Sequence, residues 1–163
     1  LTGWVYWDGA WRYHNGAGAQ VTGWVNLSGS WFYLAPETGA MATGWQMVAD
    51  KWFFFAANGA MKTGWLYTSG AWYYLDPSGS MHTGWLKMGS HWYLMGDSGA
   101  MTIGWKPMGG TWYYFDASGR MVTGWQQIGG VWYYFGTGGD MYTGGHWIGW
   151  RWYTFSSGGQ WLG

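Results

Sequence analysis

The sequence predicts an all-β protein, a solenoid of stacked β-hairpins with about eight repeats of 20 residues. Three observations predict this fold class. A Gly-Trp pair returns every 20 residues, a second Trp follows each first Trp by seven residues, and a turn sequence lies between the two. Units of this size bury surface mainly against their neighbours, so a strict period of this kind is typical of a repeat array.

The composition excludes several classes of protein. The 163 residues include 19 Trp, 13 Tyr, 7 Phe and 32 Gly, and only 9% are charged, whereas disordered chains are poor in aromatics and rich in charge. Seven Lys and Arg balance seven Asp and Glu, so no basic stripe is present to bind nucleic acid. Cys is absent, which excludes disulfides and Cys-based zinc sites. No apolar run is long enough to span a membrane, so the chain is not expected to be membrane-spanning.

The Trp positions define the repeats and the expected domain. The first Trp of each repeat is Trp4, Trp24, Trp45, Trp65, Trp85, Trp105 or Trp125, and the second is Trp11, Trp31, Trp52, Trp72, Trp92, Trp112 or Trp132. An eighth repeat has Gly145 in place of the first Trp and keeps Trp152 as the second. We expect residues 1–163 to form a single repeat domain, with 143–163 as a degenerate C-terminal capping repeat. Because the sequence starts inside a motif, we expect a module cut from a longer protein.

The repeat from 64 to 75 shows how one hairpin should pair. The Ser69-Gly70 turn places Thr68 opposite Ala71 and Trp65 opposite Tyr74. Since side chains alternate along a strand, one face carries Trp65, Tyr67, Trp72 and Tyr74 and the other carries Leu66, Thr68, Tyr73 and Leu75. The Leu75 and Thr68 positions are apolar in almost every repeat, which predicts that their face is the core. The other face keeps two Trp beside a variable position, which indicates an exposed binding surface.

No catalytic, metal or cofactor site is expected. The seven acidic residues all lie in turns or loops between hairpins, where Asp commonly caps the backbone, and none forms a recognisable acid/base pair. The four His residues occupy different repeat positions without the spacing of metal ligands.

The aromatic face itself has two interpretations. The Trp and Tyr side chains could simply hold small hairpins together, because a short hairpin buries little surface alone. Alternatively, two Trp of one hairpin and an aromatic residue of the next could form an open box. Such a box attracts a quaternary ammonium ion, which needs no hydrogen-bond partner.

The stretch from Gly44 to Phe55, followed by Gly59 to Trp65, closely resembles the choline-binding repeats of pneumococcal and phage cell-wall proteins. The Gly-Trp, Trp-Tyr-Tyr-Phe and Gly-x-Met-x-Thr-Gly-Trp blocks match, and they cover essentially the whole chain. The resemblance implies a left-handed solenoid and a non-catalytic, extracellular, wall-associated module. It also implies that choline groups of teichoic acid bind between consecutive hairpins.

The resemblance also implies which residues form the sites: two Trp of one repeat, a Tyr of the next and often a loop Met. The implied groups are Trp4 and Trp11 with Tyr33; Trp24 and Trp31 with Phe54; Trp45 and Trp52 with Tyr74 and Met61; Trp85 and Trp92 with Tyr114 and Met101; and Trp105 and Trp112 with Tyr134 and Met121. Two further junctions, Trp65 and Trp72 with Leu94 and Trp125 and Trp132 with Thr154, lack one ring and are expected to be weak or empty.

Two other functions stay open at this stage. The repeats could bind a glucan or another wall polysaccharide, since Trp faces also stack on sugars. A sugar site, however, would require hydrogen-bonding residues beside the rings, and the variable exposed position does not carry such residues in every repeat. The chain could also be a structural spacer, or a homodimer formed through the unusual C-terminal repeats.

Overall fold

The computed structural model describes residues 1–163 and contains sixteen strands, paired as eight separate antiparallel hairpins. The chain divides into two compact units, residues 1–82 and 83–163, each with four hairpins. The predicted all-β fold of about eight hairpin repeats is confirmed. No helix that could cross a membrane is present.

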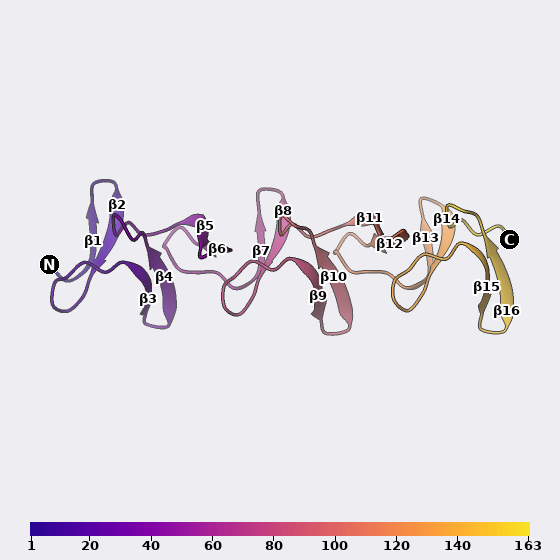
Figure 1. Cartoon of the computed structure of the whole chain (residues 1–163), viewed down its shortest axis with the longest axis horizontal. Coiled ribbons are helices and arrows are strands. Elements are labelled where there is room, and N and C mark those ends of the chain that lie inside the picture. Colours follow the sequence, from indigo (N-terminus) through magenta and orange to yellow (C-terminus); the bar gives the residue numbers. More distant parts are fainter. The chain divides into compact units, whose positions relative to one another are not determined.

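The strands are all five residues long and follow the repeat (Figure 1). In the first unit they are β1 (Gly3–Trp7), β2 (Ala10–His14), β3 (Gly23–Leu27), β4 (Ser30–Leu34), β5 (Gly44–Val48), β6 (Lys51–Phe55), β7 (Gly64–Thr68) and β8 (Ala71–Leu75). In the second unit they are β9 (Gly84–Met88), β10 (His91–Met95), β11 (Gly104–Met108), β12 (Thr111–Phe115), β13 (Gly124–Ile128), β14 (Val131–Phe135), β15 (Gly144–Ile148) and β16 (Arg151–Phe155).

The register of each hairpin is the one that the turn sequences predict. In β7–β8, Thr68 pairs with Ala71 and Trp65 with Tyr74. The last residue of the second strand supplies the core in seven hairpins, at Leu34, Phe55, Leu75, Met95, Phe115, Phe135 and Phe155, each no more than 2% exposed. The face carrying Leu66 and Leu75 is therefore the inner face, and the face carrying the two Trp is the outer one.

Consecutive hairpins within a unit are joined through the loop that follows each hairpin. The Met of this loop forms a β-bridge with the last residue of its own hairpin, as Met61 does with Phe55. The backbone N–H of the same Met61 donates to the carbonyl oxygen of Trp31 in the preceding hairpin at 2.8 Å. This link holds the inner face of one hairpin over the outer face of the hairpin before it. In Figure 1, β1–β2 and β3–β4 accordingly point to opposite sides within the first unit.

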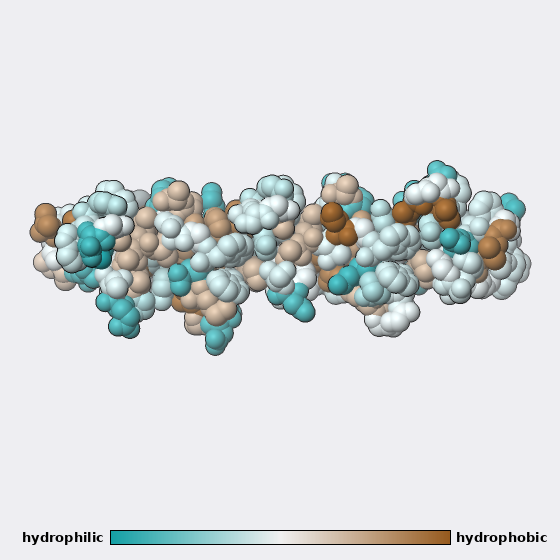
Figure 2. Space-filling model, turned by 90° about the horizontal axis from the view of Figure 1, so that it is seen from above, coloured by the Kyte–Doolittle hydropathy of each residue, from teal (hydrophilic) through white to brown (hydrophobic).

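The visible surface is mostly of intermediate hydropathy, with strongly hydrophobic atoms only in small separate patches (Figure 2). This agrees with a surface on which many Trp side chains are partly exposed, among them Trp31 at 45% and Trp72 at 43%. Rings that are half accessible remain free to contact a ligand.

The turn of the third hairpin is strained. Ala49 and Asp50 both have positive φ, 48° and 61°; this conformation costs Ala about 1–2 kcal/mol, whereas Gly, Asn and Asp adopt it more readily. We expect the double substitution Ala49→Asn and Asp50→Gly, which supplies the preferred turn pair, to raise the free energy of unfolding by about 1–2 kcal/mol. Thermal unfolding monitored by circular dichroism measures the change. Ser69→Asn is the matched control, because Gly70 already occupies the second turn position; an equal gain there would contradict the explanation.

Candidate ligand-binding site

The two Trp of a hairpin form two perpendicular walls on its outer face. In six hairpins their ring centroids lie 6.1–6.5 Å apart and their planes meet at 80–90°. The two residues are near neighbours because Trp24, for example, pairs with Tyr33, two residues beyond Trp31 on the opposite strand. A corner of two rings suits a rounded group better than a flat one.

A third ring comes from the inner face of the next hairpin. It belongs to the residue directly after the second Trp, which alternation turns toward the preceding hairpin. The first Trp of the earlier hairpin lies 4.9–5.8 Å from this ring, in the pairs Trp4–Phe32, Trp24–Phe53, Trp45–Tyr73, Trp85–Tyr113, Trp105–Tyr133 and Trp125–Tyr153.

The structure does not bring together the third ring and the two Trp in the way the sequence implied. Tyr33, Phe54, Tyr74, Tyr114 and Tyr134 lie on outer faces, each directly opposite the first Trp of its own hairpin. Tyr33, for instance, is 5.1 Å from Trp24. In each case the ring that faces the preceding hairpin belongs to the residue one position earlier in the strand. Alternation along the strand places these residues and the ring that faces the preceding hairpin on opposite faces.

The loop Met residues lie one repeat away from the Trp pairs with which the sequence grouped them. Met61 borders Trp24 and Trp31 instead of Trp45 and Trp52. The N–H of Met81 is the group that donates to the Trp52 carbonyl, at 2.7 Å. The sites of the second unit show the same offset, with Met121 beside Trp85 and Trp92, and Met141 beside Trp105 and Trp112. Met101 packs instead against Gly119.

The reason given for the two weak junctions also changes. Thr154 lies opposite Gly145 on the outer face of the last hairpin, while Tyr153 faces inward and lies 5.0 Å from Trp125. In β9–β10, Leu94 lies opposite Trp85, and alternation places Tyr93 on the inner face. The Thr154 position therefore does not decide whether a third ring is present beside Trp125.

The rings line open cavities that a third hairpin helps to close. Four cavities have volumes of about 320–480 Å³, within the range of ligand pockets. The first cavity is lined by Trp4, Trp11 and Met41. It is also lined by Ala57 and Asn58, which belong to the loop after the third hairpin, β5–β6. The others are lined in the same way by Pro77 and Ser78, by Thr137 and Gly138, and by Gly158. These loop residues were not among those predicted from the sequence, and nothing in the repeat pattern points to them.

The electrostatics of the cavities come from rings rather than from charged partners. No carboxylate lines the four cavities, so an enclosed cation would interact with π faces. Lys87 places its Nζ 5.6 Å from the Trp92 ring centroid, so one of these rings lies beside a cation of its own hairpin. No group of three or more His, Asp or Glu side chains is arranged to hold a metal ion.

The first hairpin departs from the pattern at the position of the third ring. Arg12 occupies this position, is 7% exposed, and lies 4.6 Å from the Trp7 ring. Its guanidinium donates to the carbonyl oxygens of Thr38 and Trp7. The inner face of β1–β2 therefore presents a satisfied cation instead of a ring.

Two known repeat families match the sequence. The "Choline-binding repeat" matches residues 1–43, 42–81 and 102–146, and the "Putative cell wall binding repeat" matches 83–101. None of the curated protein sequences compared with the chain matches it.

Solved structures of pneumococcal proteins share the fold over the whole chain. CbpJ from Streptococcus pneumoniae TIGR4 is 40% identical over 99% of this chain and 58% of CbpJ, with a TM-score of 0.92. Choline binding protein F from Streptococcus pneumoniae is 40% identical over 100% of this chain and 58% of that protein, also with a TM-score of 0.92. The modular autolysin LytC from Streptococcus pneumoniae is 27% identical over 98% of this chain and 42% of LytC, with a TM-score of 0.66. The chain thus spans a little more than half the length of the first two proteins.

A loop glycine that packs against the Met of the preceding loop is a testable part of the site. Gly59 has a φ of +83°, and a Cβ there would collide with the Met41 side chain. We expect Gly59→Ala to lower the free energy of unfolding by about 2–4 kcal/mol, through backbone strain and overpacking together. Chemical denaturation measures the loss.

Gly9→Ala is the control for Gly59→Ala. Gly9 has a similar φ of +74°, but nothing lies within 4 Å of its added Cβ. Gly9→Ala should lower the free energy of unfolding only by the backbone strain, about 1–2 kcal/mol. Equal losses for the two variants would show that the Met41 contact contributes nothing.

Proposed function

Because the chain belongs to the family of choline-binding repeats, we propose that it is a non-catalytic module that binds choline groups of the bacterial cell wall in the ring boxes between consecutive hairpins. In this proposal the ligand is the quaternary ammonium group, and the teichoic acids of the wall are the polymer that carries it. The module would then act outside the cell, attached to the wall.

The observation that carries the proposal is the shape and chemistry of the box. Trp105 and Trp112 meet at 83°, and Tyr133 closes a third side 4.9 Å from Trp105. Met141 lies beside them and supplies a polarizable thioether. A trimethylammonium group is rounded, charged and unable to donate a hydrogen bond, so it is matched by π faces and needs no polar side chain.

The same geometry argues against a polysaccharide as the main ligand. A sugar ring is flat and carries hydroxyl groups, so its sites combine a ring platform with several side chains that form hydrogen bonds. Perpendicular Trp walls offer no such platform. The polar side chains at these cavities are few, for example Asn58 and Ser78, and each already forms hydrogen bonds in its own loop.

Related proteins support this assignment. Choline binding protein F has a structure in complex with ipratropium, a quaternary ammonium compound, and the alignment with that structure gives 37% identity and a TM-score of 0.90. Another structure of the same protein was obtained in the presence of a peptidoglycan analogue. The ipratropium complex agrees with a module that accepts quaternary ammonium groups.

Repetition gives the proposed module its strength. One box of three partly exposed rings contributes only a few kcal/mol, which corresponds to weak binding of a single choline. Several boxes on one chain can engage several groups of one polymer, so that later contacts form at a high effective concentration. A homodimer through the C-terminal repeats would double the number of boxes, and it stays a prediction from the sequence.

A neutral analogue tests whether charge or shape drives binding. The compound 3,3-dimethyl-1-butanol has the size of choline but carries no charge. With about 0.5–1 kcal/mol per ring from the cation, we expect it to bind at least about tenfold more weakly than choline. Titration followed by Trp fluorescence measures both, with a malto-oligosaccharide series in parallel. Equal binding of the two compounds, or a response to the sugar alone, would overturn the proposed function.

A pair of conservative substitutions tests which ring closes the box. Phe53 faces Trp24 at 4.9 Å, whereas Phe54 lies against Trp45 in its own hairpin. Leu keeps the apolar contacts but removes the π face. We therefore expect Phe53→Leu to weaken choline binding at Trp24 and Trp31 about two- to fivefold. Site-resolved NMR of the indole N–H signals during a choline titration provides the measurement.

Phe54→Leu is the matched control for the same titration. It should leave the midpoints of the Trp24 and Trp31 signals unchanged, because its side chain belongs to the outer face of the next hairpin. If Phe54→Leu weakened this site while Phe53→Leu did not, the third-ring assignment would be wrong.

A further inference from the structure

The last loop of the chain places a Trp where six of the other seven loops have Met and the first has Gln20. Trp161 forms the same β-bridge to the end of its hairpin, with Phe155, that Met141 forms with Phe135. Its N–H donates to the Trp132 carbonyl at 2.9 Å, as the Met141 N–H donates to Trp112 at the same distance. The backbone is therefore equivalent at the two positions, and only the side chain differs.

The Trp corner and the third ring of this junction match those of the box beside Met141. The Trp125 and Trp132 rings lie 6.4 Å apart at 80°, against 6.3 Å and 83° for Trp105 and Trp112. Tyr153 lies 5.0 Å from Trp125, and Tyr133 lies 4.9 Å from Trp105. The corner and the third ring are thus preserved at the junction of β13–β14 with β15–β16.

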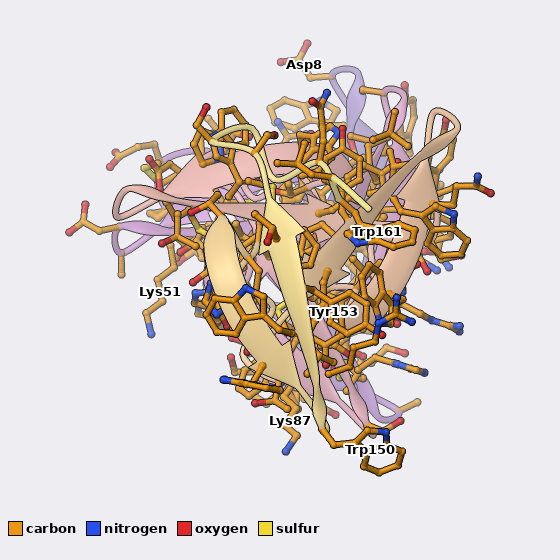
Figure 3. All side chains as sticks on the ribbon, turned by 90° about the vertical axis from the view of Figure 1, so that its right-hand side faces the viewer. Asp8, Lys51, Lys87, Trp150, Tyr153 and Trp161 are labelled. Carbon is orange, nitrogen blue, oxygen red and sulfur yellow. The ribbon has the colours of Figure 1, made fainter.

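Trp161 lies beside this box without covering its second Trp. Its ring centroid is 5.7 Å from that of Trp125 and 6.3 Å from that of Tyr153, and Figure 3 shows Trp161 and Tyr153 close together. Trp132 remains 41% exposed, nearly the same as Trp112 at 44%. Trp161 is itself 37% exposed, so part of its ring is also accessible.

We infer that this junction is a four-ring site for a quaternary ammonium ion, formed by Trp125, Trp132, Tyr153 and Trp161, and that it binds choline more tightly than the Met-containing boxes of the chain. The inference rests on the proposed function, since it assumes that the boxes take this ligand. A thioether is replaced by an indole, and the indole face is the strongest π partner for a cation among the side chains. One additional ring at a partly exposed site should tighten binding about two- to fivefold.

Arg151 adds a positive charge near the four-ring site. Its Cζ lies 5.3 Å from the Tyr153 ring centroid, and the side chain is exposed. A guanidinium beside one face of Tyr153 opposes a second cation there, although solvent screens the effect. Arg151→Gln should therefore leave the affinity of the four-ring site unchanged or slightly raised.

The experiment is a choline titration of the whole chain, followed by the indole N–H signals of the two matched Trp pairs. We expect the Trp125 and Trp132 signals to reach half-saturation at about two- to fivefold lower choline than those of Trp105 and Trp112. Trp161→Met, which installs the side chain found at the same position in other repeats, should remove this difference. Met141→Trp should bring the Trp105 and Trp112 site to the lower midpoint.

The possible outcomes separate this inference from the proposed function. If all four signals respond but Trp125 and Trp132 saturate at equal or higher choline, the four-ring site is wrong and the proposed function stands. Tighter binding at this junction after Trp161→Met would also overturn the inference, because it would mean that Trp161 fills the box. If neither Trp pair responds to choline, the proposed function itself fails. The thermal midpoint of Trp161→Met serves as the control for folding.

Discussion

One backbone hydrogen bond fixes the geometry of every junction described within the two units. The N–H of the loop residue, Met in most repeats, donates to the carbonyl of the second Trp in the preceding hairpin at 2.7–2.9 Å. An isolated two-stranded hairpin is marginally stable in water. This bond sets the distance at which the inner face of one hairpin covers the outer face of the previous one. The buried core and the ring boxes both result from that single spacing.

The rings of the boxes are consequently also the rings that hold the stack together. Trp105 contacts Trp112 and Tyr114 of its own hairpin, and Tyr133 and Phe135 of the next. Edge-to-face pairs of this kind stabilise a small fold beyond their buried area. The two interpretations of the aromatic face, packing and ligand binding, therefore involve the same side chains. Replacing such a Trp by Ala would reduce folding and binding together, whereas substitutions at the edge of a box can separate the two effects.

The fold was predictable from the sequence because its signals are local. Turn pairs such as Ser69-Gly70 set the register, and the apolar positions such as Leu75 identify the core face. The sites were predicted only in part. The structure brings the two Trp together in six hairpins, and the ring that Trp45 contacts across the junction is Tyr73, whereas Tyr74 was expected there. Which face of the next hairpin covers a Trp depends on how hairpins stack, and that spacing is not encoded within one repeat.

Differences between repeats matter more for function than the repeat itself. The third ring is Phe at the first two junctions and Tyr at others, and the fourth wall is Met except at the last junction, where it is Trp161. On a polymeric ligand, the tightest box holds its group longest, and every other box then samples the polymer at a raised effective concentration. In the proposed function, a moderate gain at one junction therefore carries over to the avidity of the whole chain. The side chain at position 161 would influence retention on a polymer more than any equal change at a weaker box.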